Sequence, residues 1–279
     1  MTVIGPTSAS KLSIMLLPAG TCPRSVTIPP AEGGLSEQAG CTVPKNNAGR
    51  PLDAANSILS SLPHDQFEML LPYMTRETFA QGVVLVEAGD EIDFVYFPHK
   101  GVVSLLSVLK DGRAVEIATA GQEGVVGAMA GLGFLTSFVR VVVQLPLEAT
   151  RVPASRFRKA AARSDVMRSL CLRYNESLFS QTRIAAACNA VHLIEARFCR
   201  WLLQTSNRAG TKTVTLTQEL VAELMGVRRT SITEVASKLQ AAGVVHYSRG
   251  VINILDAAAL ERLSCECYSL QLDQSEALR

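Results

Sequence analysis

The sequence lacks the signatures of several protein classes. No apolar run reaches the ~18 consecutive residues that a membrane-spanning helix needs. The apolar stretch 13–17 has only Lys11 before it and is followed at once by Pro18, so we expect no secretory signal. There is no phosphate-binding glycine loop, no nucleophile elbow and no His-Glu metal motif, so an enzyme has little support.

Paired Cys-x-x-Cys motifs are also missing, although the chain has seven cysteines. An odd number of scattered cysteines, three of them in helical sequence, indicates reduced thiols in a cytoplasm rather than a disulfide framework. Cys265 and Cys267 stand two apart and suggest either a metal site or an accident of surface spacing, and we favour the accident. We therefore expect no structural zinc site and no cofactor.

What is present fits a globular protein of two domains and a tail. The 279 residues are 48% hydrophobic and 19% charged, with a formal net charge of +2. Residues 1–50 are rich in Pro, Gly, Ser and Thr and show no hydrophobic period, so we expect a flexible N-terminal tail. Short helical material is predicted at 56–71, with Pro63 starting a new turn.

An antiparallel β-roll is predicted within residues 51–160. Clusters of β-branched and apolar residues predict short strands, and Gly- or Asp-containing turns separate them. The strands are expected at 83–86, 94–97, 102–108 and 139–143, with turns at 88–90, 98–101, 110–113 and 120–122. Asp111-Gly112 is a strong hairpin signal. Many short strands with regular turns are typical of an antiparallel barrel or roll.

A long helix is predicted next, in a segment 161–193 that ends in a hinge at 190–193. Seven of its residues recur at alternating intervals of four and three, the period of a helix that packs along a partner helix. They are Met167, Cys171, Tyr174, Leu178, Gln181, Ala185 and Cys188. We favour a dimer seam, in which Gln181 helps to fix the register. The alternative is that the same face packs on the chain's own roll.

The final segment, 194–279, carries the pattern of a winged helix-turn-helix after a helix at 194–204. Thr217 is suited to cap one helix and Gly226 to end it in a left-handed conformation. A second helix should then bury Ile232 and the apolar residues that follow at helical spacing. The hairpin 244–254, with Arg249 in its turn, would be the wing. Together these patterns predict an α+β chain: β-roll, long helix, winged helix-turn-helix.

The outward side of the second predicted helix is polar and basic. From Ala196 to Gly250 there are eight Lys or Arg against three Asp or Glu, a balance of +5 on a nearly neutral chain. A modest basic face of this kind fits specific DNA binding better than bulk coating of nucleic acid. The alternative, a plain helical hairpin packed in a core, is less favoured because this side has few apolar groups to bury.

The order of these elements resembles the cyclic-AMP receptor protein and Fnr family of bacterial transcription regulators, over roughly Leu52 to Asp256. Three motifs carry the resemblance, in the family's order. They are Val84-Leu85-Val86-Glu87-Ala88-Gly89-Asp90, then Gly121-Gln122-Glu123-Gly124-Val125-Val126-Gly127, then the segment from Leu216 to Ile232. The resemblance implies a homodimer whose two recognition helices enter successive major grooves of palindromic double-stranded DNA. It leaves contact with RNA polymerase open and implies no membrane.

The resemblance also assigns residues to the DNA. Arg229, Thr230 and Glu234 match places that face base edges, although Thr230 departs from the acidic residue usual in the cyclic-AMP receptor branch. Glu234 has an alternative role as a solvated or salt-bridged residue. The contacts expected with phosphates or near them come from Thr217, Gln218, Arg228, Ser231, Thr233 and Arg249.

The ligand pocket of the family is degenerate in this sequence. Cyclic-nucleotide binders use a Gly-Glu pair for the ribose and an Arg-Ser or Arg-Thr pair for the phosphate. The matching residues here are Gly127-Ala128 and Arg140-Val141, which lack the carboxylate and the hydroxyl. We therefore expect no tight binding of cyclic AMP, with Arg140 an ordinary exposed strand residue as the alternative to a weak phosphate site.

A redox or haem role has weaker support. Cys22 and Cys41 are too few and too far apart to match the compact N-terminal cysteine cluster of the iron–sulfur branch. His99 and His192 are more simply structural or solvated than haem ligands. Cys171 and Cys188 remain candidates for an oxidant response. The functional alternative to a DNA-binding regulator is a nucleotide- or redox-sensing module that acts through protein contacts.

Overall fold

The computed structural model describes residues 56–277, all within one compact unit of the chain. The predicted tail 1–50 lies outside the described residues. Two short helices, α1 (Ser57–Ser60) and α2 (His64–Leu70), and the 3-10 turn η1 (Leu71–Tyr73) come first. Asn56 caps α1 by accepting hydrogen bonds from the Ile58 and Leu59 amides, and Pro63 precedes α2, as the sequence predicted.

The β-roll is an antiparallel sheet in the order β1-β5-β3-β4, with β2 also paired to β5. Its strands and the elements that follow them are β1 (Thr75–Phe79), β2 (Val84–Val86), β3 (Phe94–Val108), β4 (Ala114–Ala120), η2 (Ala128–Leu132), β5 (Arg140–Pro153) and α3 (Ala154–Ala161). The sequence analysis missed β1 and β4 and made β5 too short. The hairpin at Asp111-Gly112 is confirmed, since it joins β3 to β4.

The turn predicted at 98–101 is wrong. Residues 94–108 form one strand, β3, whose register against β5 shifts at Pro98, Lys100 and Val102. Gly101 has φ +83°, and a Cβ there would lie 2.1 Å from the Pro146 carbonyl oxygen. The glycine therefore allows an irregular passage within a strand rather than a chain reversal, because β5 supplies the partner along its whole length.

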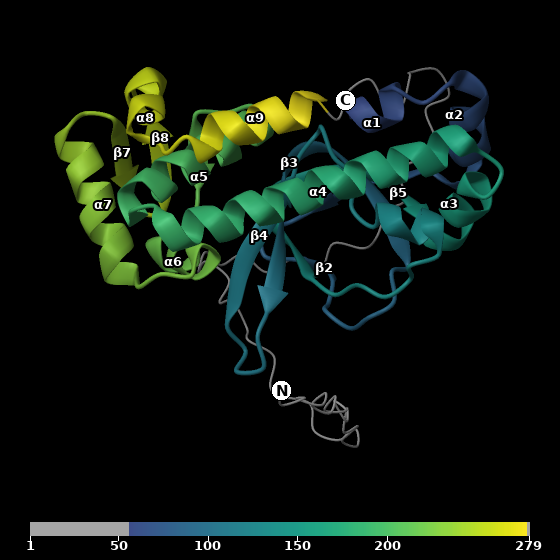
Figure 1. Cartoon of the computed structure of the whole chain (residues 1–279), viewed down its shortest axis with the longest axis horizontal. Coiled ribbons are helices and arrows are strands. Elements are labelled where there is room, and N and C mark those ends of the chain that lie inside the picture. The colour runs from purple at the N-terminus through teal and green to yellow at the C-terminus, as the bar shows by residue number, and fades with distance from the viewer. Residues whose placement is uncertain (1–55, 278–279) are drawn as a thin grey trace, which may run out of the picture. The chain divides into compact units, whose positions relative to one another are not determined.

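The long helix α4 (Asp165–Val191) begins where the Ser164 hydroxyl accepts a hydrogen bond from the Met167 amide. It packs across the roll, with the C-terminal helix α9 (Cys267–Ala277) beside it (Figure 1). Extended backbone at His192 and Leu193 separates α4 from α5 (Ile194–Ala209), so the predicted hinge is narrower than 190–193.

The predicted seam faces the interior of the same chain, which corrects the preferred interpretation. Five of the seven side chains are buried, and Leu178 and Ala185 are half-buried. Met167, Cys171 and Tyr174 belong to one core with residues of the roll, while the Gln181 Oε1 accepts hydrogen bonds from Thr119 and Arg208. Met167, Cys171, Tyr174, Leu178, Gln181, Ala185 and Cys188 therefore support the alternative, packing on the chain's own body.

The winged helix-turn-helix follows α5. Its elements are β6 (Thr213–Thr215), α6 (Gln218–Met225), α7 (Arg229–Ala241), β7 (Val245–Ser248), β8 (Val251–Ile254) and α8 (Ala257–Leu263). The small sheet has the order β6-β8-β7. Phe198, Trp201 and Leu202 of α5 are buried in the core that these elements share, as predicted. Across residues 56–277, no helix has both the length and the apolar character of a membrane span.

Candidate DNA interface and ligand pocket

Local sequence signals build the helix-turn-helix. The Thr217 hydroxyl accepts a hydrogen bond from the Leu220 amide at the start of α6. Gly226 ends α6 with φ +65°, and the Val227 amide donates to the Ala222 carbonyl across the turn. After Arg228, whose backbone is extended, α7 begins. A side chain at Gly226 would be strained by its positive φ, so the glycine fixes where α6 stops and α7 starts.

The two sides of α7 differ as the sequence predicted. Ile232, Val235, Ala236 and Leu239 are buried in the core of the domain. The opposite side is open: Arg228, Arg229, Thr230, Thr233 and Glu234 are exposed, and Ser231 is half-buried. A helical hairpin buried in a core would not leave this polar set in solvent, so the geometry favours a surface that meets a polar partner.

The charged groups on this surface are held only loosely. Arg229 Nε lies 3.6 Å from Glu219 Oε2, and the two side chains are 67% and 74% exposed. Glu234 lies 3.9 Å from Lys238, which also approaches Glu195 at 3.5 Å. Exposed pairs of this kind contribute little to stability, about 0–1 kcal/mol. Arg229 is therefore able to exchange its carboxylate for another partner at low cost.

One polar contact aligns the starts of the two helices. The Thr233 hydroxyl lies 2.6 Å from Gln218 Oε1 and 3.1 Å from the Arg229 carbonyl oxygen. Gln218 and Thr233, both predicted to lie near phosphates, are thus brought together. The cap residue Thr217 is exposed beside them.

The wing is anchored at its base and open at its tip. The Tyr247 hydroxyl donates to the Leu216 carbonyl at 2.6 Å, and the Tyr247 amide donates to Gln240 Oε1 at 2.8 Å. At the tip, Arg249 and Gly250 both have positive φ, 49° and 78°, as in the tight turns that suit hairpins. Arg249 is exposed, as expected for a side chain that approaches a DNA backbone.

A cavity of about 470 Å³ lies between the roll and α4. Gly127, Ala128 and Val141, three of the four predicted pocket residues, line it. Arg140 does not line it: its Nε donates to both carboxylate oxygens of Glu87, at 2.9 and 3.0 Å. None of the described residues that line the cavity is Lys, Arg, Asp or Glu. The lining is mostly aliphatic and aromatic, with Tyr174, Leu178 and Phe179 supplied by α4.

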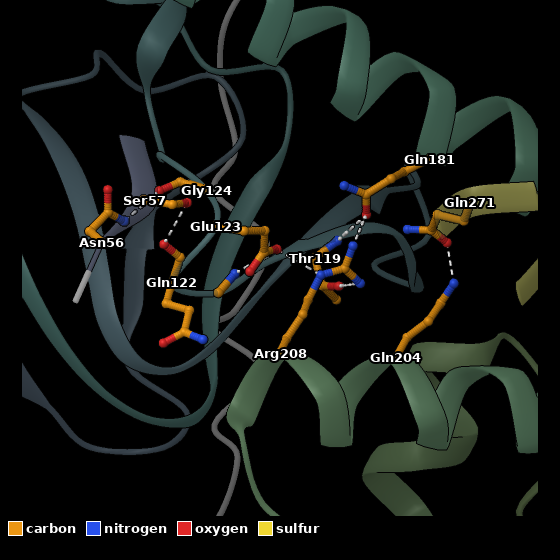
Figure 2. A network of polar contacts seen from close by, with 11 residues as sticks. Asn56, Ser57, Thr119, Gln122, Glu123, Gly124, Gln181, Gln204, Arg208 and Gln271 are labelled. Carbon is orange, nitrogen blue, oxygen red and sulfur yellow. Dashed lines mark hydrogen bonds and ion pairs between the residues drawn. The ribbon is translucent and has the colours of Figure 1, made fainter. Parts of the chain in front are cut away.

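A polar junction ties the winged domain to the roll (Figure 2). From the end of α5, Arg208 donates to Glu123 Oε1 at 2.8 Å, to the Thr119 hydroxyl at 2.6 Å and to Gln181 Oε1 at 3.1 Å. The Arg208 side chain is only 12% exposed. The sequence analysis missed this role because Glu123 and Arg208 are 85 residues apart and neither forms a motif.

A second junction lies at the β3–β4 hairpin. The buried carboxyl of Glu116 accepts from Trp201 Nε1 at 2.8 Å, from the Ser104 hydroxyl at 2.6 Å and from Gln144 at 3.1 Å. Near it, a Cβ on Gly226 would lie 3.1 Å from a methyl group of Val115. The turn of the helix-turn-helix therefore rests on β4, so a shift of β4 would be felt at the start of α7.

The remaining predicted residues have structural places. His99 is buried in β3, with its Nε2 2.8 Å from the Thr150 hydroxyl. Cys171 is buried in the core of the roll, and burial raises the pKa of its thiol to about 11. A thiol held protonated in this way is a poor nucleophile toward oxidants, so Cys171 is weakly suited to the predicted oxidant response.

Family models match both parts of the chain. A cyclic nucleotide-binding domain matches residues 76–164, and a Crp-like helix-turn-helix domain matches residues 196–263. The global nitrogen regulator of Nostoc sp. is 24% identical over 195 residues, which cover 67% of this chain and 87% of that protein. The global nitrogen regulator of Synechocystis sp. is 23% identical over 222 residues, covering 76% and 95% of the two chains.

Solved structures share the fold. FixK2 from Bradyrhizobium japonicum superposes with a TM-score of 0.60 at 15% identity, over 69% of this chain and 98% of that one. A transcriptional regulator of the CRP/FNR family from Thermus thermophilus superposes with a TM-score of 0.56 at 18% identity, over 68% and 98%. With a cyclic nucleotide-binding-like roll, a Crp-like helix-turn-helix and this fold, the chain belongs to the Crp/Fnr family of DNA-binding transcription regulators.

Proposed function

We propose that this regulator acts as a homodimer that binds palindromic DNA through two copies of α7. The observation that carries the proposal is the exposed, basic start of α7 above a fully buried apolar side. In a two-fold dimer the two helices would enter successive major grooves, about 34 Å apart. Arg229 would hydrogen-bond a guanine through two of its N–H groups, and Thr230 and Glu234 would face neighbouring base edges.

The remaining polar residues would fix the protein on the backbone. Arg228 and Ser231 lie at the start of α7, Thr217 and Gln218 at the start of α6, and Arg249 at the wing tip. Contacts from such places position a protein on the duplex without reading its sequence. Thr233, held by Gln218, would support the alignment of the two helix starts.

We place the dimer contact on the outward side of α4, opposite the buried seam. Leu172 and Phe179 are 57% and 53% exposed and stand seven residues apart, and the exposed Ala186 follows at the same interval. Arg183 stacks on Phe179 at 4.4 Å and pairs with Glu176 at 2.5 Å. A stripe of apolar residues at intervals of seven, flanked by charges, suits a parallel partner helix.

The path from sensor to DNA would run through the two junctions. Thr119 and Glu116 belong to β4, whereas their partners Arg208 and Trp201 belong to α5. A shift of β4 or α4 would thus move α5 about the short hinge at 192–193 and change the spacing of the two α7 helices. The path is a hypothesis about a two-state element, which an effector can bias only by binding its two states differently.

The pocket is proposed to be degenerate toward cyclic nucleotides. A cyclic phosphate needs a positive side chain, and Arg140 is already paired with Glu87 outside the cavity lining. Calorimetric titration with cyclic AMP should give no binding at micromolar concentrations. Heat of binding that saturates in the micromolar range would overturn this part of the proposal.

DNA binding is tested by selection from random duplexes, followed by mobility shifts on the enriched sequence. The proposal expects an inverted repeat and a complex of two chains per duplex. Enrichment of a single unrepeated site would exclude the paired helices. Failure to enrich any sequence at low salt would favour the alternative, a sensing module that acts through protein contacts.

A further inference from the structure

Three cysteines and a histidine meet at the hinge between α4 and α5. Cys188 lies in the last turn of α4 and His192 directly follows the helix, whereas Cys265 precedes α9 and Cys267 is its first residue. One ligand atom from each side chain can be chosen so that all four lie within 4.8 Å of one another. Cys265 and Cys267 are buried, so the expectation of an accidental pair on the surface is wrong.

The spacing of these atoms fits a single metal ion. Cys188 Sγ lies 3.5 Å from Cys265 Sγ, and Cys267 Sγ lies 3.6 Å from His192 Nδ1. Zinc binds thiolate sulfur at ~2.3 Å and imidazole nitrogen at ~2.0–2.1 Å in a tetrahedron, so neighbouring ligand atoms stand somewhat less than 4 Å apart. The two sulfurs are much farther apart than the ~2.05 Å of a disulfide bond.

The surroundings of the four residues resemble the outer shell of a metal site. His192 directs Nδ1 toward Cys267 and places Nε2 3.1 Å from Glu266 Oε1. Histidines that bind metals commonly give their second ring N–H to a carboxylate, which fixes the orientation of the ring. Glu266 thus occupies the place of that supporting group.

The charge and access of the site also fit. Three thiolates with one Zn²⁺ leave a net charge of −1. Arg200 is buried, and its positive charge acts on both Cys188 and Cys265. The three cysteines are less than 9% exposed and the His192 side chain is 20% exposed. Four protein ligands in a closed site are typical of structural rather than catalytic zinc.

We propose that Cys188, His192, Cys265 and Cys267 bind one zinc ion. The ion replaces three thiol protons, which are released to solvent, and fills its fourth position with the neutral His192 imidazole. Because two ligands precede the winged domain and two follow its last helix α8, the ion ties the two ends of segment 194–264 together. The ligand set also explains why no Cys-x-x-Cys motif announces it: the two pairs are about 75 residues apart.

The test is metal analysis of the full chain, purified under reducing conditions and loaded with Zn²⁺ or Co²⁺. Elemental analysis should give about one zinc per chain, and Co²⁺ should show the intense visible absorption of a tetrahedral thiolate site. Cys267→Ser and His192→Gln should each lose most of the bound metal. Cys171→Ala, and a chain with both Cys22 and Cys41 changed to Ser, are matched controls that should keep it.

Three results would overturn the proposal. Wild-type chain that takes up no zinc after loading would exclude the site. Zinc retained in Cys267→Ser but lost when Cys22 and Cys41 are changed would place the metal elsewhere. A Cys188–Cys265 disulfide that persists in the reducing buffer would show a covalent pair in its place. If a variant does not fold, the metal content and Co²⁺ spectrum of wild type still decide whether a tetrahedral thiolate site exists.

Discussion

At the scale of single residues, Arg229 has the side chain most free to read DNA. It is two-thirds exposed, and its one ion pair, with Glu219, is exposed as well. Arginine that meets guanine through two hydrogen bonds contributes about 1–3 kcal/mol of discrimination between bases. Its loss should therefore weaken specific binding and leave the fold intact.

We predict that Arg229→Ala binds the selected operator about 5- to 150-fold more weakly, with an unchanged thermal midpoint. The reason is that the lost contacts are with DNA alone. Competition mobility shifts on operator and scrambled duplex measure it. Arg163→Ala, exposed in the link before α4, is the matched loss of one charge. Equal weakening by both variants would show that Arg229 acts only as a general positive charge.

Glu116 offers a test by pH. Burial raises the pKa of its carboxyl, although hydrogen bonds from Ser104 and Trp201 and the charges of Arg200 and Arg208 act in the opposite direction. The folded state therefore binds the proton more tightly than the unfolded state, whose pKa is about 4.3. The carboxyl should lower the free energy of unfolding as the pH rises from that value through the folded pKa.

We predict that Glu116→Gln gains stability relative to wild type as the pH increases over this window, by at most about 1.4 kcal/mol per pH unit. Urea unfolding of both chains between pH 4 and pH 7 gives the difference, from which the other titrating groups cancel. A difference that is flat, or that falls with pH, would show that the carboxyl is stabilised as an anion.

At the scale of elements, α4 carries two apolar stripes with similar spacing. One stripe, from Met167 to Cys188, is covered by the chain itself, and the other contains the exposed Leu172 and Phe179. Both have intervals of three and four or of seven, so periodicity alone could not decide which one meets a partner. Only the position of the roll and of α9 separates them.

We predict that Leu172→Glu combined with Phe179→Glu converts the dimer to a monomer. Carboxylates would face their copies across the two-fold axis, while the subunit core would remain untouched because both positions are exposed. Sedimentation equilibrium measures the mass, and Lys159→Glu on α3 is the control for an added acidic residue. A doubly substituted chain that stays dimeric would place the dimer contact elsewhere.

The elements that the sequence predicted well are those with local signals. Thr217 and Gly226 mark the two ends of α6, and the wing follows from a short turn between β-branched strands. By contrast, β3 was divided at Pro98–Gly101 because its continuity depends on pairing with β5, some 50 residues away. The Arg208 junction and the cysteine–histidine cluster were missed for the same reason, since both arise from contacts between distant segments.

At the scale of the whole molecule, the account joins a roll, a long helix and a winged domain into one device. The pocket residues of α4 lie on the helix that also carries the outward stripe, with Phe179 common to both. Occupation of the pocket and association of two chains would thus be linked through one element. Such linkage is reciprocal, so an effector that strengthens DNA binding must itself bind more tightly to the DNA complex.

The most direct test of the paired recognition helices is hydroxyl-radical footprinting of the wild-type chain on its selected operator. The account predicts two symmetric protected regions whose centres are about one helical turn, 10–10.5 base pairs, apart. It also predicts that Leu172→Glu with Phe179→Glu abolishes both regions together. A single protected region that this variant leaves unchanged would contradict the account.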